Sequence, residues 1–367
     1  LVNPELAEKC AFWSIAEATS TSNANNLPDY GRYIGMPTRH SKISNHEEEN
    51  KVKFTFKAVL AAAIMSVGLG AGSTVQAGKR VVLPDLDWTG AVVTCRTIQW
   101  VLENHMDYKV KTVSMPGGPG VWEAIRAGDI DFYCETWPSY NPIKSEYLKE
   151  YGGDGSLVRI ADTGIIGASG YFTPRYVVEG DSSRGIEAVA PGLKTVQDLN
   201  QYKDHFKSLE SGDKGNLIAC PEVAWLCEDQ ERMDGLGVDF HAQNMGSETA
   251  HWAEMQAKYK RGEPFVAYAW TPHWIFAALD LVEVELPAYD EAKWPATNWP
   301  KDICFKFGSP ASIEKHPEVV ALLEKHRLTN DQQAGMIYEV DVNKRDVDEV
   351  VAEWMEANES VWRSWLP

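Results

Sequence analysis

The chain has 367 residues, 44% of them hydrophobic, which is enough for two domains with buried cores. Its formal net charge of −18 argues against nucleic acid as a partner, because binding to phosphates needs a positively charged face. The acidic balance otherwise bears on solubility and not on the fold.

Residues 51–77 have the pattern of a secretory signal peptide. A basic start with three lysines precedes an apolar run over residues 58–69, and the small-x-small sequence Val-Gln-Ala follows at residues 75–77. The alternative is a membrane anchor, but the apolar run is shorter than the roughly 20 residues that a span needs. We expect this segment to be cleaved, and the mature exported protein to begin near Gly78.

Residues 1–50 precede this segment, although a signal peptide normally begins a protein. They are polar, lack clear periodicity and include an acidic run at residues 47–49. We hypothesise that translation starts near Val52, and that residues 1–50 are upstream sequence read in frame and disordered.

Strand-like apolar runs and helical spacings alternate at the start of the mature chain. In order, they predict strand, helix, strand, helix and strand at residues 80–84, 91–105, 110–115, 121–127 and 130–133. This order implies an α/β fold with parallel pairing and right-handed crossovers. Ligands of such sheets bind beyond the carboxyl ends of the strands, and Trp88 and Trp137 follow two of these ends.

A second α/β unit follows, with expected helices at residues 196–206 and 249–261 and expected strands at residues 217–219 and 265–270. From residue 316 onward, alternating apolar and charged residues predict several helices. This order fits a two-lobed cleft protein whose second lobe is inserted into the first. We expect lobe 1 at residues 78–168 plus 272–367, and lobe 2 at residues 169–271.

Cys220 and Cys227 lie close together in a proline-containing stretch. Because export places them in an oxidising compartment, we expect a local disulfide, the alternative being two buried thiols. The pairing of Cys95, Cys134 and Cys304 stays open. No paired CxxC or Cys/His cluster has the spacing of zinc ligands, so we expect no metal site and no cofactor.

Most of the fourteen tryptophans are expected to pack in the core or on the surface, but four lie at junctions between strands and loops, at Trp88, Trp137, Trp225 and Trp270. Converging indole faces suit a trimethylammonium group, which offers diffuse positive charge and apolar methyls but no hydrogen-bond donor. The alternative is a sugar-binding cleft, in which aromatic residues give a similar pattern.

The chain resembles the glycine betaine/proline-type substrate-binding proteins of ABC importers over most of residues 80–310. The resemblance rests on Trp-Pro at 137–138, Cys-Pro…Trp…Cys at 220–227, Tyr-x-Trp-Thr-Pro-x-Trp at 268–274 and the stretch at 122–132. It implies a two-lobed, type II periplasmic-binding-protein (Venus-flytrap) fold, in which each lobe is a mostly parallel sheet flanked by helices. It also implies that Trp137, Trp225 and Trp270 are cage walls, with Trp88 as a fourth. The implied partner is an ABC permease with its ATPase, and we expect a monomer.

Two departures from this pattern bear on the ligand. Six residues separate the two cysteines, one more than in betaine binders, where the amides of this loop hold the ligand's carboxylate. Glu135 lies two residues before Trp137, on the same side of an extended segment. Facing the pocket, it would repel the carboxylate of glycine betaine and pair with choline or protonated trimethylamine N-oxide; the alternative is that it faces solvent or a lysine. We therefore favour trimethylamine N-oxide or choline.

Two other functional classes compete with an importer subunit: an exported α/β hydrolase, and a sensory protein that binds the same ligands. GxSxG, HExxH and Walker motifs are absent from the sequence, and its histidines are scattered. We therefore predict a binding protein without catalytic residues.

Overall fold

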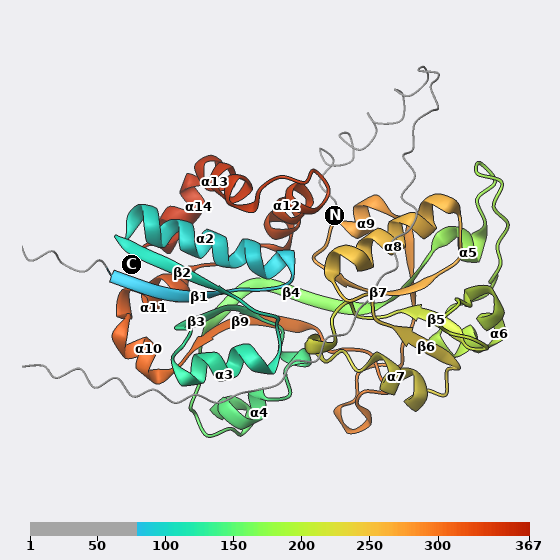
Figure 1. Cartoon of the computed structure of the whole chain (residues 1–367), viewed down its shortest axis with the longest axis horizontal. Helices are drawn as coiled ribbons and strands as arrows, with labels where there is room; N and C mark the ends of the chain where they lie inside the picture. The colour runs from blue at the N-terminus through green and yellow to red at the C-terminus, as the bar shows by residue number, and fades with distance from the viewer. Residues whose placement is uncertain (1–78) are drawn as a thin grey trace, which may run out of the picture. The chain divides into compact units, whose positions relative to one another are not determined.

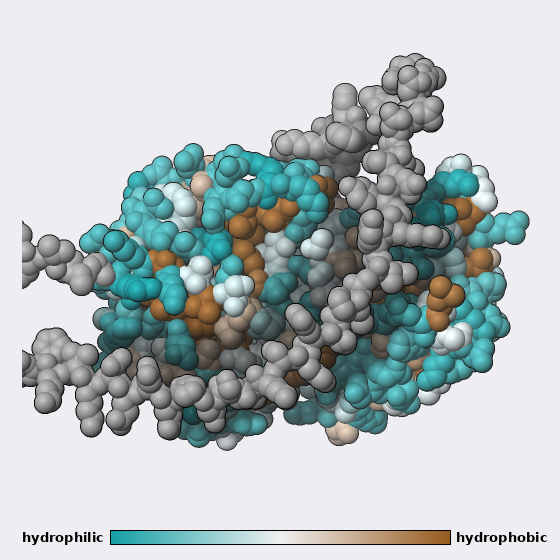
Figure 2. All heavy atoms as spheres, viewed as in Figure 1, coloured by the Kyte–Doolittle hydropathy of each residue, from teal (hydrophilic) through white to brown (hydrophobic). Residues whose placement is uncertain are grey.

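The computed structural model describes residues 79–367, which belong to one compact unit (Figure 1). The expected signal segment at residues 51–77 and the upstream residues 1–50 lie outside the described residues. Within the described part, none of the helices combines the length and the apolar character that crossing a bilayer requires. Hydrophilic side chains cover much of the face drawn in Figure 2, as expected for so acidic a chain.

The first elements follow the predicted order. They are β1 (Lys79–Asp85), α2 (Thr89–His105), β2 (Tyr108–Ser114), α3 (Pro119–Ala127) and β3 (Phe132–Thr136). β1 and β2 pair in parallel, as expected. β3 instead pairs with β9 (Asp302–Gly308), and this pairing is antiparallel. The apolar positions that predicted α2 are buried, among them Val93, Ile98, Val101 and Leu102.

A seven-stranded sheet forms the centre of the described unit, with the strand order β3-β9-β4-β7-β5-β6 and with β8 (Leu281–Val284) paired to β4. The long strand β4 (Val158–Pro174) pairs with β9 along residues 158–167 and with β7 (Val266–Thr271) along residues 168–172. It therefore runs through two parts of the unit. We call the part with β1, β2, β3 and β9 the first half, and the part with β5, β6 and β7 the second half.

The parallel pairing expected for the second unit is present, since β5 (Gly215–Ile218) pairs in parallel with both β6 (Phe240–Gln243) and β7. All pairs that involve β4 are antiparallel. The central sheet is thus mixed, whereas mostly parallel sheets were expected. The reason is that the chain crosses from the first half to the second along β4. The strands paired with β4, which are β7, β8 and β9, run in the opposite direction.

Helices flank the sheet in both halves (Figure 1). In the second half they are α5 (Arg175–Glu179), α6 (Leu199–Tyr202), α7 (Asp229–Gly235), α8 (Glu248–Arg261) and α9 (Ile275–Ala278). α4 (Lys144–Tyr147) follows β3. The expected carboxyl-terminal helices are α10 (Pro310–Lys315), α11 (Pro317–Lys325), α12 (Asn330–Asp341), α13 (Val347–Ala357) and α14 (Glu359–Trp362). α12 and α13 pack against α2, so the end of the chain supports the helix that follows Trp88.

Candidate ligand-binding site

A cavity lies between segments of the two halves. Its lining residues are Trp88, Gly117, Gly118, Tyr133, Trp137, Tyr140, Asn141, Trp225, Tyr268 and Trp270. The four tryptophans singled out in the sequence thus lie on one shared cavity, although they are far apart along the chain. Three tyrosines, which the sequence did not single out as ligand contacts, complete the aromatic lining.

The indole rings meet mostly edge to face. The ring centroids of Trp88 and Trp225 are 5.7 Å apart at an interplanar angle of 73°, and those of Trp225 and Trp270 are 5.6 Å apart at 79°. Trp270 also lies 5.5 Å from Tyr268. Such pairs contribute packing energy of their own. They hold neighbouring rings at steep angles, so the faces of different rings can surround one small ligand.

Two walls come from the first half. Trp88 is the residue before α2 and has an extended backbone. Trp137 directly follows β3 and precedes Pro138, the first residue of a short 3-10 turn. Proline disfavours the helical region for the residue before it, so Trp137 stays extended at the end of its strand. The Trp137 ring lies against Gly167 of β4, where a Cβ atom would collide with it.

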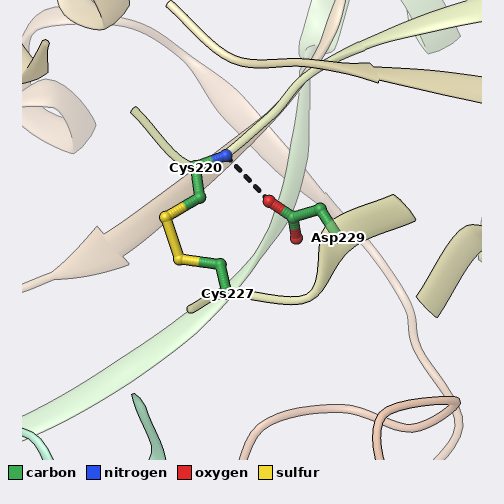
Figure 3. A group of neighbouring side chains, drawn as sticks. All are labelled: Cys220, Cys227 and Asp229. Carbon is green, nitrogen blue, oxygen red and sulfur yellow. Dashed lines mark hydrogen bonds between the residues drawn. A yellow bond between two sulfur atoms is a disulfide. The ribbon is translucent and has the colours of Figure 1, made fainter. Parts of the chain in front are cut away.

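The other two walls come from the second half. Trp270 is the fifth residue of β7 and pairs with Ser169 of β4. Trp225 ends a 3-10 turn that begins at Val223, inside the loop closed by Cys220 and Cys227. The two cysteines form a disulfide, as predicted (Figure 3).

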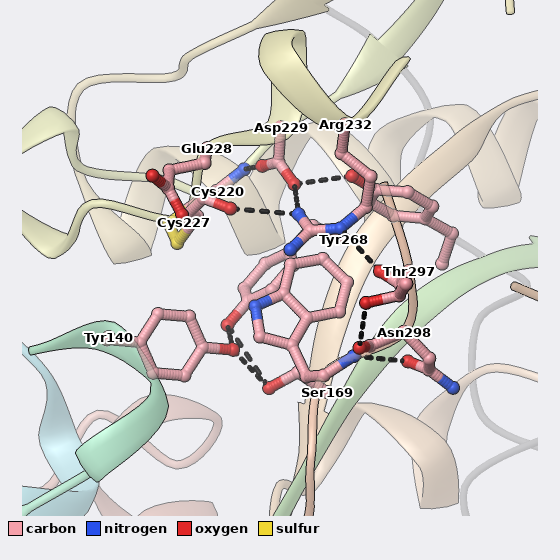
Figure 4. Close-up of polar contacts among 12 residues, drawn as sticks. Tyr140, Ser169, Cys220, Cys227, Glu228, Asp229, Arg232, Tyr268, Thr297 and Asn298 are labelled. Carbon is pink, nitrogen blue, oxygen red and sulfur yellow. Dashed lines mark hydrogen bonds and ion pairs between the residues drawn. A yellow bond between two sulfur atoms is a disulfide. The ribbon is translucent and has the colours of Figure 1, made fainter. Parts of the chain in front are cut away.

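A buried ion pair between Asp229 and Arg232 contacts both ends of this disulfide loop. Asp229 accepts a hydrogen bond from the Cys220 N–H (2.8 Å), and Arg232 donates to the carbonyl oxygen of Cys227 (2.9 Å) and lies 3.4 Å from Asp229 (Figures 3 and 4). The Tyr171 hydroxyl donates to the same carboxylate (2.5 Å). Burial raises the pKa of Asp229, and Arg232 opposes that shift. The two ends of the loop that carries Trp225 are therefore held by charge as well as by the disulfide.

The remaining cysteines, whose pairing was open, are also placed. Cys95 of α2 and Cys134 of β3 form a second disulfide, and Cys304 is a buried free thiol. The second disulfide links the helix that follows Trp88 to the strand that precedes Trp137. Both disulfides therefore lie in or next to segments whose tryptophans line the cavity.

The cavity also contains a polar contact between the halves. The hydroxyls of Tyr140 and Tyr268 are 2.8 Å apart, and Tyr140 also donates to Ser169 (Figure 4). Trp299 packs behind both tyrosines and stacks under the guanidinium of Arg232, 3.5 Å from the ring centroid. Trp299 is therefore a buried support of the aromatic lining.

Glu135 does not line the cavity. Its fully buried carboxylate accepts hydrogen bonds from Trp137 Nε1 (3.0 Å), Thr94 Oγ1 (2.7 Å) and Gln333 Nε2 (2.7 Å). Burial raises the pKa of Glu135, and these donors act against that shift. Glu135 is therefore hydrogen-bonded to the ring of Trp137, and it does not face solvent.

One group of potential metal ligands among the described residues is Glu248, His273 and Asp341. His273 Nε2 lies 3.6 Å from Glu248 and 3.7 Å from Asp341. His273 Nδ1 accepts a hydrogen bond from the Ile275 N–H (3.2 Å). None of these three residues lines the aromatic cavity.

Comparisons with known proteins identify the family of this chain. The family model described as the substrate binding domain of ABC-type glycine betaine transport systems matches residues 79–357. The chain belongs to this family. Its members are the substrate-binding components of transport systems, not enzymes.

Curated relatives of this family are distant in sequence. The glycine betaine-binding periplasmic protein OusX of Dickeya dadantii is 23% identical over 333 residues, which cover 83% of this chain and 94% of OusX. The glycine betaine/proline betaine-binding periplasmic protein of Salmonella typhimurium is 22% identical over 268 residues, which cover 67% of this chain and 76% of that protein.

Solved structures share the fold. The glycine betaine, L-proline-binding protein ProX of Borrelia burgdorferi aligns with a TM-score of 0.62 at 16% identity, covering 79% of this chain and 97% of ProX. An ABC-transporter choline binding protein in complex with choline aligns with a TM-score of 0.59 at 18% identity, covering 78% of this chain and 91% of that protein. This likeness shows that the expected type II periplasmic-binding-protein fold is present.

Proposed function

We propose that the protein is the periplasmic substrate-binding component of an ABC importer, and that it captures a trimethylammonium osmolyte between Trp88, Trp137, Trp225 and Trp270. The observation that carries the proposal is the convergence of these four indoles on one cavity. A quaternary ammonium group has no N–H to donate, so a ring of hydrogen-bond acceptors would not recognise it. Aromatic faces supply both negative potential and apolar contact.

The cage offers enough energy for an importer. Each desolvated cation–π contact contributes on the order of 2 kcal/mol, so four walls supply about 8 kcal/mol before the costs of association. The cavity walls are held in place before binding by disulfides and buried hydrogen bonds, which reduces the entropy lost on binding. Before the costs of association are subtracted, this energy corresponds to a dissociation constant on the micromolar scale.

The charges behind the walls favour ligands without a carboxylate. Trp137 donates its indole N–H to Glu135, and Trp225 donates its indole N–H to Asp87. Both acceptors attract a cation and repel an anionic group. We therefore propose choline or trimethylamine N-oxide as the preferred ligand over glycine betaine. Glu135 then contributes to binding through the wall that it holds.

The two halves would act as the two lobes of the binding protein, with lobe 1 at residues 78–168 plus 272–367 and lobe 2 at residues 169–271. The change of β4 partner between Gly167 and Ala168, from β9 to β7, supports the first boundary. The signal pattern at residues 51–77 and the periplasmic relatives support export. We propose that the protein acts as a monomer and docks on a permease that works with an ATPase.

Titration calorimetry of the purified protein tests this function. Choline, trimethylamine N-oxide, glycine betaine and a disaccharide are titrated in parallel, and the ligand is recovered afterwards. We expect saturable one-to-one binding of choline or trimethylamine N-oxide, no binding of the disaccharide, and recovery of unchanged ligand. Failure of every trimethylammonium compound to bind would overturn the proposal. Binding of glycine betaine at least tenfold tighter than the other two would overturn the ligand preference alone.

A further inference from the structure

Asp87 lies in the turn between β1 and α2, directly before Trp88. Its Oδ1 atom accepts a hydrogen bond from the Gly117 N–H at 2.9 Å. The same carboxylate accepts the indole N–H of Trp225, with Nε1 at 3.2 Å from Oδ1 and 3.1 Å from Oδ2. Gly117 belongs to the first half and Trp225 to the second, 138 residues away from Asp87 in the sequence. The carboxylate therefore joins two cavity-lining segments from opposite halves.

The backbones of these two segments are also in close contact. Gly118 has a φ of +103°, and a Cβ atom at this position would collide with the carbonyl oxygen of Ala224, the residue before Trp225. Only glycine allows this backbone conformation and this approach together. The loop after β2 and the disulfide loop thus meet next to the Asp87 carboxylate, and the contact brings Trp225 over the first half.

The hydrogen bond to Asp87 fixes the direction of the Trp225 ring. The indole nitrogen is the only donor of that side chain, and its ring otherwise makes edge-to-face contacts with Trp88 and Trp270. Trp225 is only partly buried and packs at the edge of the core, so the core encloses only part of its ring. Because a charged acceptor makes a stronger hydrogen bond than a neutral one, Asp87 holds this ring firmly.

The negative charge of Asp87 also acts on its surroundings. Burial raises the pKa of the neighbouring Glu222 carboxyl, and the charge of Asp87 raises it further. A carboxylate that accepts an indole N–H makes the ring face more negative, and a cation on that face gains from both the ring and the charge behind it. A neutral ligand of the same shape gains only the apolar contact.

We propose that Asp87 is a positioning and specificity-determining residue of the cage. It holds Trp225 of the second half over the first half, and it selects cationic ligands over neutral ligands of the same shape. This inference rests on the proposed function, because it assigns Asp87 a part in binding a trimethylammonium ligand. Asp87 does not line the cavity, and we infer that it affects ligand binding through Trp225.

The first test needs no ligand. In a ¹H–¹⁵N spectrum of the protein labelled at its indole nitrogens, the Trp225 signal is assigned by its loss in Trp225→Phe. We expect Asp87→Ala to shift this signal upfield, because a charge-assisted hydrogen bond is lost. Asp85→Asn is the matched control, since Asp85 pairs with Arg96 (2.8 Å) and leaves Trp225 untouched. A Trp225 signal that does not move in Asp87→Ala refutes the contact, whatever the ligand is.

The second test is a double-mutant cycle in calorimetry, with choline or trimethylamine N-oxide as the probe, whichever the wild type binds more tightly. We expect Asp87→Ala to weaken binding about tenfold or more, and Asp87→Asn to weaken it less. In the Trp225→Phe background, Asp87→Ala should cost less than about twofold, because its partner is already gone. An equal loss in both backgrounds would mean that Asp87 acts only on the loop at Gly117, and the proposal would fail.

The third test separates charge from shape. Choline, which carries a net positive charge, and its neutral isostere, in which carbon replaces the quaternary nitrogen, are titrated into the wild type and Asp87→Asn. We expect the ratio of cation to isostere affinity to fall about threefold or more in the variant, since a unit charge is lost near the ligand. An unchanged ratio would refute the specificity role. If the wild type binds neither probe, the proposed function fails, and the indole spectrum still decides whether Asp87 holds Trp225.

Discussion

Glu248 of α8 accepts a hydrogen bond from the backbone N–H of Thr89, the first residue of α2, at 2.9 Å. The two residues belong to opposite halves. Trp88 occupies the N-cap position of α2 and offers no side-chain cap, so the carboxylate of Glu248 takes over that task. Thr89 also donates its hydroxyl to Asp341 (2.7 Å). The start of α2, next to a cage wall, is thus anchored to the second half.

This anchor predicts an effect on ligand release. Replacing Glu248 by Gln removes the charge that faces the helix amino terminus, a contribution of about 1 kcal/mol. We expect Glu248→Gln to raise the dissociation rate of the bound ligand about fivefold, with little change in the association rate. Stopped-flow fluorescence of the tryptophans measures both rates. Glu254→Gln on the same helix is the control, since Glu254 lies on the outer face and pairs with Lys258. Equal dissociation rates in wild type and Glu248→Gln would contradict this role.

The cage walls themselves predict a graded loss of affinity. Trp137→Ala removes one face, which is worth about 2 kcal/mol, so we expect the dissociation constant to rise about thirtyfold. Trp354→Phe, in the carboxyl-terminal helix α13, should leave the constant unchanged. Calorimetry checks both variants. A Trp137→Ala protein that binds as tightly as the wild type would remove Trp137 from the cage.

A methyl group added at Gly167 is expected to displace the Trp137 ring and so to disturb the site. A Cβ atom at this position collides with the Trp137 ring, which has no space to retreat because its indole N–H is held by Glu135. We expect Gly167→Ala to weaken ligand binding about tenfold and to lower stability by about 1 to 3 kcal/mol. Gly120→Ala serves as the control, since nothing lies within 4 Å of a Cβ atom there. Should both variants bind equally well, the ring position would not be critical.

We expect Asp302 to make the protein less stable as the pH rises, the opposite of the usual effect of a carboxylate. It is buried, and it accepts hydrogen bonds from the N–H (2.7 Å) and the hydroxyl (2.5 Å) of Ser139. Burial raises the pKa of Asp302 from 3.8 to about 6. Because the pKa is higher in the folded state, the folded protein holds this proton more tightly. The stabilisation is therefore complete below about pH 4 and is lost as the pH rises through about 6.

The variant Asp302→Asn keeps an acceptor for the Ser139 N–H and cannot ionise. We expect its free energy of unfolding to exceed that of the wild type by about 3 kcal/mol at pH 7, and the difference to vanish near pH 4. Urea unfolding at several pH values measures this difference, in which the contributions of the other titrating groups cancel. A difference that stays constant with pH would show that Asp302 does not titrate in this range.

Local patterns in the chain were sufficient to single out the four tryptophans that line the cavity. Strand-forming runs end just before Trp88 and Trp137, and a strand contains Trp270 near its end; α/β folds bring such ends to one edge of a sheet. The disulfide between Cys220 and Cys227 could be predicted because its two cysteines are only seven residues apart. These features depend on periodicity and short separations, which a sequence displays directly.

The supporting contacts depend on how distant segments pack. A spacing of two residues predicts that Glu135 and Trp137 lie on the same side of an extended segment. It does not predict that the Glu135 carboxylate is fully buried and hydrogen-bonded to the Trp137 ring. The partners of Asp87 and Glu248 lie 138 and 159 residues away. Such contacts form only when β4 carries the chain from one half to the other and the returning strands bring the loops together. Residue types and helical or strand periods therefore identify the walls, whereas long-range packing decides which carboxylates hold them.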